Sequence, residues 1–399
     1  MKVAVIHPLK HHAYYSLEGV AKSGADVIGL FGYYNRGDFF DKLLNKTKFK
    51  SLVDGWKYEP IDKYVTTSFW IKFLFLLSKK WPSKFEKIYT KEFQKWCIMQ
   101  LDNVDCIHVL QDYCNDVIRY AYEQGIQIVY EQIQPFDTVQ RRILDEEVQK
   151  VGISPKYISA RFPKEKIKKQ IENIGYSTAI VTASDATYKS VIELGVESNI
   201  VYRFPYGSDF AKVIRKKNIK FNNTLRVLYI GNISLIKGVQ YVIEAAEQLQ
   251  NSGIYFTFIG KPASTRDRFF IDQIEKLKNC KYKESVPHTE IFNKYFENDV
   301  FIFQGLCEGF GMVTLEAMFC GLPCVVSTGG IGIVQDGFNG YVNENGDVET
   351  LVKNIMKLKD PILRKRMSQN AVMSANECTW EKYTNNISNV YLNMFGTNI

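Results

Sequence analysis

Several features that define other classes of protein are missing from this chain of 399 residues. No apolar run approaches the roughly 18 residues needed to span a bilayer. The N-terminus, MKVAVIHPLK, turns polar too soon for a signal peptide. No G-x-G-x-x-G follows the first predicted strand, residues 2–6, so a nicotinamide-binding Rossmann domain has little support. Arginine-rich stripes and RNA-binding motifs are also missing, which argues against a nucleic-acid partner.

Cysteine is scattered rather than clustered. None of the eight cysteines belongs to a C-x-x-C pair, and they fall within predicted strands and helices. This pattern predicts buried free thiols instead of a disulfide framework or a zinc site. Together with the missing signal peptide, it indicates a cytoplasmic protein.

The composition is that of a globular protein, with 46% hydrophobic and 24% charged residues, and the length allows two domains with separate cores. The formal net charge of +8 is unevenly distributed, because residues 41–100 hold thirteen lysines and only six acids. Such a positive field suits an anionic membrane surface or a negatively charged substrate.

Within this basic region, residues 69–81 (FWIKFLFLLSKKW) are apolar nearly all round and end in two lysines and a tryptophan. One interpretation is a helix in the membrane interface, with aromatic rings at headgroup level and lysines on anionic lipid. The other is a helix packed on the first sheet, with its lysines extended to solvent. The two have similar support, with the packed helix slightly ahead.

The most informative stretch is residues 301–330, FIFQGLCEGFGMVTLEAMFCGLPCVVSTGG. An apolar strand over residues 300–303 leads into a glycine-rich bend at 308–311. A helix is predicted from about Met312 to the glycine at 321, and Cys324 opens the next buried strand. Glu308 and Glu316, eight residues apart, therefore flank the N-terminus of one helix.

This arrangement combines an anion site with acceptors for hydroxyl groups. Glycines at 309 and 311 allow backbone N–H groups to approach a ligand, and the helix dipole favours an anion there. Carboxylates are poor phosphate ligands but good acceptors for hydroxyl protons. The residues therefore predict a ligand with phosphates and several hydroxyls, such as a nucleotide sugar. An ordinary βαβ unit with surface glutamates explains the carboxylate spacing about equally well.

A second candidate phosphate loop follows the predicted strand at residues 225–230. It runs from Gly231 through Asn232 to Lys237 and Gly238, and a helix with one apolar face begins at residue 239. Loop amides and the point charge of a lysine at a helix N-terminus suit a phosphate. Surface lysines at such ends are common, so the loop is a moderate signal by itself.

These motifs together resemble family 4 of the retaining glycosyltransferases, which have the two-domain GT-B fold. The resemblance rests on Glu308-x7-Glu316 within EGFGMVTLEAMFCGLP, on the Ser-Thr-Gly-Gly that follows, and on DGFNG at residues 336–340. It is strong from about residue 225 to 392 and looser, by strand order and a few loops, over residues 1–210. It implies an α/β chain of two Rossmann-like, doubly wound domains that face a central cleft.

The resemblance assigns roles residue by residue. In that family the first glutamate contacts the donor sugar near the reaction centre and the second holds the ribose hydroxyls, which places Glu308 and Glu316 in these roles. Lys237 matches a lysine that clamps the diphosphate, whereas Asn232 replaces the usual arginine and cannot neutralise charge. The loop amides that meet the sugar and diphosphate would be those of Gly309, Phe310, Gly311, Met312, Val313 and Thr314, and the base would lie near Gly260, Lys261 and Val286.

The first loop departs from the family pattern. Lys10, His11 and His12 stand near the usual Gly-Gly, and a minority branch of the family has a basic, histidine-containing loop at this point. The resemblance places the loop over the donor phosphates or the acceptor, and a solvated polar loop is the alternative. A strand predicted at residues 126–130 leads into Glu131 and Gln132, and Glu131 is grouped with the loop residues on this side. These two residues stand where many members have a histidine that touches the donor sugar, which is consistent with a different sugar.

The expected domains are residues 1–210 on the acceptor side and residues 211–379, which would bind the nucleotide sugar. A polar link is expected at 211–224, and a last helix at 380–399 crosses back onto the first domain. The implied reaction is retaining transfer of a hexosyl group from a UDP- or GDP-linked sugar to a glycan, polysaccharide or glycolipid. No cofactor is implied, and without a D-x-D the sequence gives no case for the metal that GT-A enzymes use. The inner face of the cell membrane is the candidate surface for peripheral binding.

Two alternatives keep the same fold. A sugar-nucleotide epimerase is one, although paired glutamates fit retaining transfer better, and a phosphorylase would need a cofactor lysine and a far longer chain. A non-catalytic partner subunit is the other. Glu308, Glu316 and Lys237 argue against that subunit, while Asn232 and the missing histidine argue mildly for it.

The diphosphate assignment is testable. Lys237→Ala should weaken the binding of a nucleoside diphosphate, because Asn232 cannot supply a compensating charge, and Asn232→Arg should tighten it. Isothermal titration calorimetry with UDP and with GDP measures both changes. Unchanged affinity in Lys237→Ala would place the phosphate site elsewhere.

Overall fold

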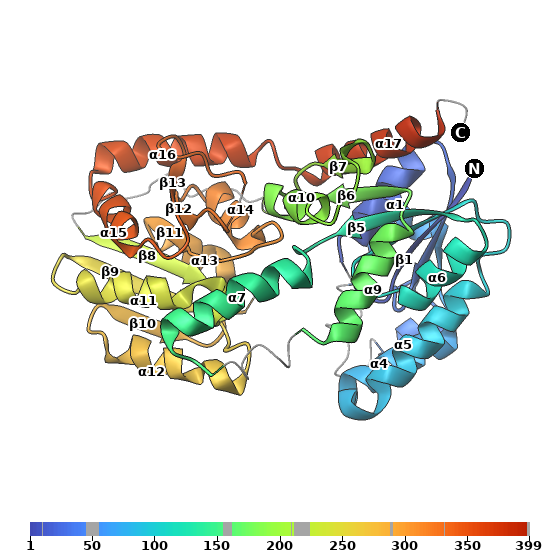
Figure 1. Cartoon of the computed structure of the whole chain (residues 1–399), viewed down its shortest axis with the longest axis horizontal. Coiled ribbons are helices and arrows are strands. Elements are labelled where there is room, and N and C mark those ends of the chain that lie inside the picture. Colours follow the sequence, from blue (N-terminus) through green and yellow to red (C-terminus); the bar gives the residue numbers. More distant parts are fainter. Residues whose placement is uncertain are drawn as a thin grey trace.

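The structure is a computed structural model that describes residues 1–9, 11–44, 56–154, 162–208, 210, 224–287, 290–330 and 332–396. Lys10 and residues 211–223 of the expected link lie outside this part of the chain. Within it, two parallel β-sheets lie side by side along the long axis of the molecule, and helices cover each of them (Figure 1). This is the two-domain α/β architecture that the sequence predicts, and the domain boundaries themselves stay a prediction.

The first sheet has the strand order β3-β2-β1-β4-β5-β6-β7 in the described residues, and every pairing is parallel. Its strands are β1 (Lys2–His7), β2 (Asp26–Phe31), β3 (Val65–Thr66), β4 (Cys106–Leu110), β5 (Gln127–Gln132), β6 (Ala179–Thr182) and β7 (Val201–Arg203). The connecting helices are α1 (Ala13–Lys22), α2 (Phe39–Leu44), η1 (Glu59–Tyr64), α4 (Phe69–Lys80), α5 (Pro82–Ile98), α6 (Asn115–Glu123), α7 (Asp137–Val151), α9 (Lys164–Gly175), α10 (Asp185–Ile192) and η2 (Ser198–Ile200).

Side chains of the first sheet alternate between two helical layers, as the period of a strand requires. Val3 and Val5 join the core that contains α1 and α17 (Trp380–Phe395), whereas Ala4 and Ile6 join the core under α4, α5 and α6. Strand β5 extends two residues beyond the predicted end at residue 130. Glu131 is therefore a strand residue on the α17 side, and its assignment to a loop at the strand end was wrong.

The second sheet has the order β10-β9-β8-β11-β12-β13, again with parallel pairing throughout the described residues. Its strands are β8 (Leu225–Ile230), β9 (Ile254–Ile259), β10 (Cys280–Lys283), β11 (Val300–Phe303), β12 (Cys324–Ser327) and β13 (Gly340–Asn343). Its helices are η4 (Leu235–Lys237), α11 (Val239–Gln248), η5 (Thr265–Asp267), α12 (Arg268–Lys276), α13 (Ile291–Phe296), α14 (Met312–Phe319), α15 (Val348–Lys357) and α16 (Pro361–Ala375).

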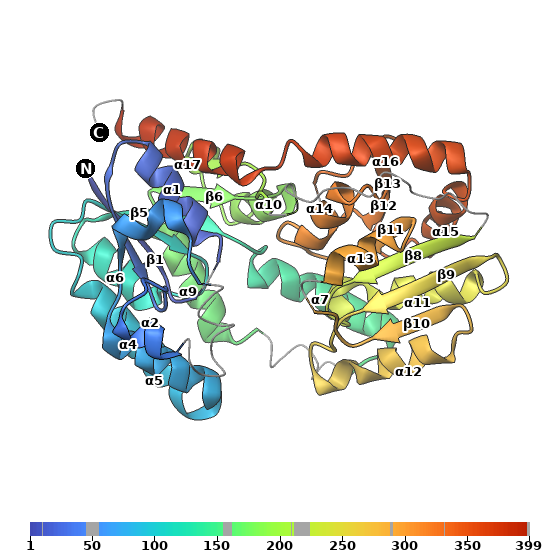
Figure 2. The same ribbon diagram turned by 180° about the vertical axis from the view of Figure 1, so that it is seen from behind.

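Helix α17 returns to the first sheet after the second is complete, as expected. Figure 2 shows α16 above the second sheet and α17 beside α1 of the first. The two helices pack closely because Gly19 has no side chain, and a Cβ there would lie 2.6 Å from the Cβ of Ile387. Where the chain crosses between the domains, a Cβ on Gly207 would lie 2.1 Å from the backbone nitrogen of Trp380. The two crossing segments are therefore in direct backbone contact.

Helix α4 has one face packed on the first domain and exposes large apolar side chains elsewhere. Ile71, Leu74 and Phe75 are buried against the first domain, whereas Phe69 and Trp70 are 65% and 53% exposed. The expectation that its lysines reach solvent fails for one of them. Lys72 is 1% exposed, with its ammonium 2.7 Å from Asp38 and 3.0 Å from Asp41. Among the described residues, no helix is both long and apolar enough to cross a membrane.

The expectation of free thiols is confirmed. All eight cysteines are unpaired, and only Cys280 is not fully buried. Burial raises the pKa of several of these thiols, to about 12 for Cys106 and Cys307. They are therefore packing residues that stay protonated at neutral pH.

Candidate active site

A cavity of about 530 Å³ lies between the two domains, at the carboxyl ends of both sheets. Loops at this edge of parallel sheets are where α/β folds bind ligands. The first domain and the returning chain line it with His11, His12, Ile133, Gln134, Tyr206 and Trp380. The second domain lines it with Gly231, Asn232, Lys237, Phe303, Glu308, Phe310, Gly311, Met312 and Val313. The two motifs singled out in the second half of the sequence therefore meet in one cavity.

The N-terminus of α14 opens on this cavity. Gly311 caps the helix in the left-handed region, with φ +74°, which glycine adopts without steric cost. Met312 and Val313, in the first turn, line the cavity. Backbone N–H groups of a first turn have no partners within the helix, so they are available to an anion, which the helix dipole also favours.

Lys237 and Glu308 form an ion pair inside the cavity. Lys237 Nζ lies 2.6 Å from Glu308 Oε1, and the lysine and glutamate side chains are 26% and 6% exposed. Gly238 brings the lysine loop against β11, since a Cβ there would lie 1.7 Å from the carbonyl oxygen of Gln304. The resemblance implies separate roles for these two residues, whereas the structure pairs them. An anion that binds here competes with Glu308 for the lysine.

Several other residues expected to bind the donor do not line this cavity. Glu316 is half-buried and accepts a hydrogen bond from the hydroxyl of Tyr295 at 3.0 Å. Thr314 is fully buried in the same helix. Gly260 lies against the first phosphate loop, since a Cβ there would be 1.8 Å from the carbonyl oxygen of Gly231. Lys261 is exposed and Val286 is half-buried, both outside the cavity lining.

Gly309 touches the first domain rather than an open ligand space. A Cβ on this residue would lie 2.0 Å from the carbonyl oxygen of Ile133 and 3.0 Å from the side-chain nitrogen of Gln134. Gln111, just after β4, holds that loop, because its side-chain oxygen accepts from the backbone N–H groups of Ile133 and Gln134 at 3.0 and 2.8 Å. The absence of a side chain at position 309 thus serves contact between the domains.

The first loop contributes two histidines to the cavity wall. His11 and His12 line it, with ring centroids 4.2 Å apart, and His7 lies behind them. Burial and the neighbouring His12 and His7 lower the pKa of His11 to about 2. Burial likewise lowers the pKa of His7 to about 4, against a backbone hydrogen bond to Leu9 that raises it. His7 and His11 are therefore neutral at physiological pH.

Glu131 has no exposed surface and does not line the cavity. Its carboxylate accepts from Nε2 of His12 at 2.5 Å, from the Tyr383 hydroxyl at 2.7 Å, and from Ser16 Oγ and Nε2 of His108 at 3.2 Å. Burial alone would raise the pKa of Glu131, but the two histidines outweigh it and hold this pKa well below its usual range. The ionised carboxylate stabilises the fold at neutral pH, and this contribution is lost as the pH falls through the folded-state pKa.

Sequence reasoning missed most of this network. Tyr383 was noted only as part of the last helix, and His108 and Ser16 were not noted. The available signal was the alternation of side chains between the two faces of β5. Val129 is a core residue on the α17 side, so Glu131, two positions further, points to the same side. A carboxylate at such a position requires buried donors, which the helix that packs there had to supply.

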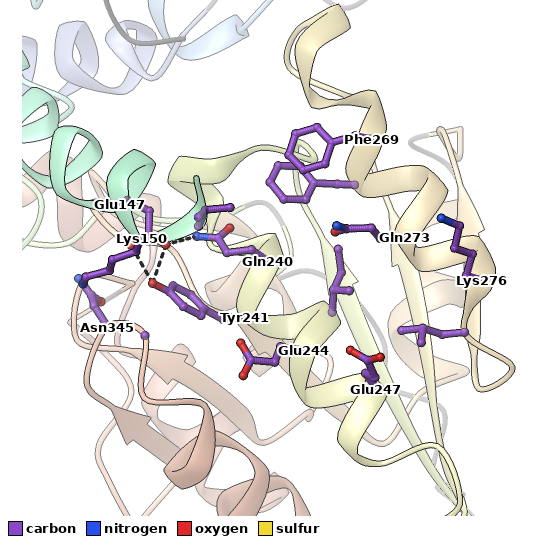
Figure 3. Close-up of a pocket in the computed structure, with 15 residues that line it drawn as sticks. Glu147, Lys150, Gln240, Tyr241, Glu244, Glu247, Phe269, Gln273, Lys276 and Asn345 are labelled. Atoms are coloured by element: carbon purple, nitrogen blue, oxygen red, sulfur yellow. Dashed lines mark hydrogen bonds between the residues drawn. The ribbon is translucent and has the colours of Figure 1, made fainter. Parts of the chain in front are cut away.

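A larger cavity, of about 740 Å³, lies away from these residues between α7, α11 and α12 (Figure 3). The carboxylate of Glu147 on α7 accepts from the hydroxyl of Tyr241 at 2.6 and 2.7 Å and from the side-chain amide of Gln240 at 3.0 Å. This cavity is lined by none of the predicted site residues. We therefore assign the chemistry to the smaller cavity. In the described residues no cluster of three His, Cys, Asp or Glu side chains could hold a metal ion.

The site combines one cation, an amide-rich helix start and a carboxylate with little exposure. Such a combination can bind a phosphate group and place a negative charge beside a carbon atom that becomes electron-poor. Tyr206, Phe310 and Trp380 supply aromatic walls to the cavity.

Comparison with known proteins identifies the second domain. Residues 210–372 match the family described as "Glycosyl transferases group 1". An uncharacterized glycosyltransferase of Methanocaldococcus jannaschii is 28% identical over 176 residues, which cover 41% of this chain and 47% of that protein. The Escherichia coli UDP-Gal:alpha-D-GlcNAc-diphosphoundecaprenol alpha-1,3-galactosyltransferase is 25% identical over 193 residues, 45% of this chain and 50% of that protein. The chain thus spans about half the length of the curated relatives it matches.

Likeness to solved structures extends over the whole chain. The Anabaena protein HepE, determined in complex with UDP-glucose, has 16% sequence identity and a TM-score of 0.65, over 99% of this chain and 100% of that one. At this identity the likeness concerns the fold. The fold is GT-B, as the sequence predicts.

The contact at Gly309 gives a prediction about domain spacing. Gly309→Ala should hold the two domains further apart, because the added methyl group overlaps the carbonyl oxygen of Ile133. Small-angle X-ray scattering should show a larger radius of gyration than in the wild type. Gly175→Ala is the matched control, since a Cβ there has no atom within 4 Å. Identical scattering from Gly309→Ala and the control would show that this contact does not set the spacing in solution.

Proposed function

We propose that this protein, with a glycosyl transferases group 1 domain over residues 210–372, transfers a hexosyl group from a nucleotide sugar to an acceptor, with retention and without a catalytic metal. The observation that carries the proposal is the meeting of Lys237, Glu308 and the N-terminus of α14 in one interdomain cavity. UDP-sugars are the first donors to test, because the solved neighbour HepE was determined with UDP-glucose.

The ion pair of Lys237 and Glu308 supports a separate role for each side chain in the reaction. A diphosphate attracts the lysine away from the glutamate, so donor binding would release a carboxylate beside the sugar. As the bond from the anomeric carbon to the diphosphate oxygen breaks, negative charge builds on the leaving phosphate. Lys237 and the first-turn amides of α14 stabilise this charge, and Glu308 stabilises the positive charge on the sugar. The acceptor oxygen then bonds the anomeric carbon on the same face, and its proton passes to the leaving phosphate.

The first domain supports an acceptor at a membrane surface. The α4–α5 hairpin exposes Phe69, Trp70 and Trp81. Six lysines on the same hairpin are also exposed, namely Lys79, Lys80, Lys84, Lys87, Lys91 and Lys95. Exposed aromatic rings beside lysines suit the interface of an anionic membrane, where each lysine contributes about 1 kcal/mol. A relative that acts on a diphosphoundecaprenol acceptor makes a lipid-linked acceptor the first to test.

Glu308→Gln tests the chemical role. It keeps the shape of the side chain but removes the charge beside the reacting carbon, so kcat should fall about 10²-fold or more while donor binding survives. Release of nucleoside diphosphate from UDP-sugars, with and without acceptor, measures turnover, and NMR of the product gives the anomeric configuration. Glu349→Gln, an exposed carboxylate of α15, is the control. Near-normal turnover in Glu308→Gln would remove this residue from catalysis, and no release from any donor by the wild type would favour a non-catalytic subunit.

Liposome flotation tests the surface. The wild type should float with vesicles that contain anionic lipid, less so at high salt, and Phe69→Ser with Trp70→Ser should reduce binding. Ile362→Ser is the matched control, because Ile362 is 81% exposed on the second domain. If the wild type stays unbound with both anionic and neutral vesicles, α4 is only a packing helix and the acceptor is soluble or proteinaceous.

A further inference from the structure

We propose that His12 is a second cation for the donor diphosphate, with Nε2 held by the buried carboxylate of Glu131 and a protonated Nδ1 donating to a phosphate oxygen. This inference rests on the proposed function, because it names the residue that completes the positive charge of the same site. His12 would contact the ligand, and Glu131 would be a positioning residue behind it.

The cavity lacks positive charge for its proposed ligand. Lys237 is the single lysine or arginine among the described lining residues, and Glu308 already neutralises it in the unliganded chain. Asn232, at the position of the family's arginine, is neutral. A nucleoside diphosphate carries at least two negative charges at neutral pH. One lysine that also pairs with a carboxylate does not supply enough positive charge to balance them.

His12 lines the same cavity as Lys237 and is held firmly in its wall. Its carbonyl oxygen accepts from the backbone N–H groups of Tyr15 and Ser16 at 2.8 and 3.1 Å, which anchors the residue at the start of α1. Its ring lies 4.3 Å from that of Tyr206, and it is 8% exposed at the cavity wall. Glu131 Oε1 is 2.5 Å from Nε2, shorter than the roughly 2.7–2.9 Å of an ordinary charge-assisted N–H···O hydrogen bond.

The tautomer follows from this hydrogen bond. The carboxylate can only accept, so Nε2 carries the hydrogen atom. In a neutral ring Nδ1 would then have a lone pair, which would repel a phosphate oxygen. In the imidazolium Nδ1 is a donor as well, and the ring carries a positive charge. No hydrogen bond of Nδ1 occurs among the residues that the structure describes, so this atom is available to a ligand.

The environment of His12 distinguishes it from its neighbours. The titratable groups that face it from the surrounding elements are His7, His11, His108, Glu131, Tyr206 and Tyr383. Glu131 is the one anion among them. His11, with its lowered pKa and no carboxylate partner in the described contacts, stays neutral. His108 bonds the same carboxylate but is fully buried, away from the cavity.

Calorimetry between pH 6 and pH 9 tests this proposal by measuring how tightly the wild type and His12→Gln bind UDP and GDP. The neutral amide should weaken binding about tenfold at pH 6, as loss of a charged hydrogen bond predicts. The affinity of the wild type should exceed that of His12→Gln most at pH 6. This difference in affinity should shrink as the pH rises, because only the protonated ring is a cation that donates from Nδ1. Comparing the two proteins at each pH cancels the ionisation of the ligand.

Three further variants separate the ligand contact from folding. His108→Gln should lower the unfolding temperature but keep the pH-dependent difference from His12→Gln, because it leaves His12 and Glu131 in place. Glu131→Gln should bind UDP and GDP as weakly as His12→Gln does and should likewise lose the pH dependence. Asn232→Arg in the His12→Gln background should restore affinity with no pH dependence, since arginine stays charged.

Equal affinities of wild type and His12→Gln, or a tenfold loss that does not change with pH, would overturn the role of His12 as a cation. Weaker acceptor binding with unchanged affinity for UDP and GDP would overturn it as well and place the histidine on the acceptor. A wild type that binds neither nucleotide would overturn the proposed function itself, a result distinct from either of these.

Discussion

A carboxylate without solvent access is the constraint on which the first domain depends. Glu131 remains ionised only because donors from four separate elements surround it: the loop before α1, α1 itself, β4 and α17. A carboxylate removed from water carries a large desolvation cost, and leaving such a buried charge without its partner costs about 3–5 kcal/mol. Because His12 and Tyr383 are among these donors, the hydrogen bonds to Glu131 also hold His12 in the cavity wall and α17 against the first sheet.

The same strand sets how the two domains meet. Two residues after Glu131, the backbone of Ile133 reaches Gly309 of the second domain, and α7 continues to the hydrogen bonds between Glu147 and Tyr241. Tyr206 adds an edge contact to Phe310, with centroids 5.4 Å apart. The glycine-rich loop beside Glu308 therefore rests on a segment anchored by the buried carboxylate. The positions of the residues that line the cavity thus depend on how Glu131 is held inside the first domain.

The sequence predicted the local parts of this molecule and missed the distant ones. Strands at residues 225–230 and 300–303 have the predicted bounds, because buried parallel strands are short apolar runs with clear ends. The cavity residues around Glu308 and Lys237 lie in contiguous motifs, so their shared location could be anticipated, while their catalytic roles stay predictions. The surroundings of Glu131 could not, because its partners His12 and Tyr383 are 119 and 252 residues away. A charged residue at the end of an apolar run was taken for a loop residue, since sequence alone does not show which helix returns to cover it.

The return of α17 to the first sheet has a consequence for the order in which the chain can fold during synthesis. Glu131 leaves the ribosome 252 residues before Tyr383, which at about 5–20 residues per second is roughly 13–50 s. Throughout that interval the first sheet lacks one of the helices that cover this face, and Glu131 lacks one of its hydrogen-bond donors. The second domain, continuous in sequence from β8 to α16, can fold meanwhile as a unit. The first domain to be translated is therefore the last to be completed, and its exposed face is the part of the nascent chain most open to chaperones.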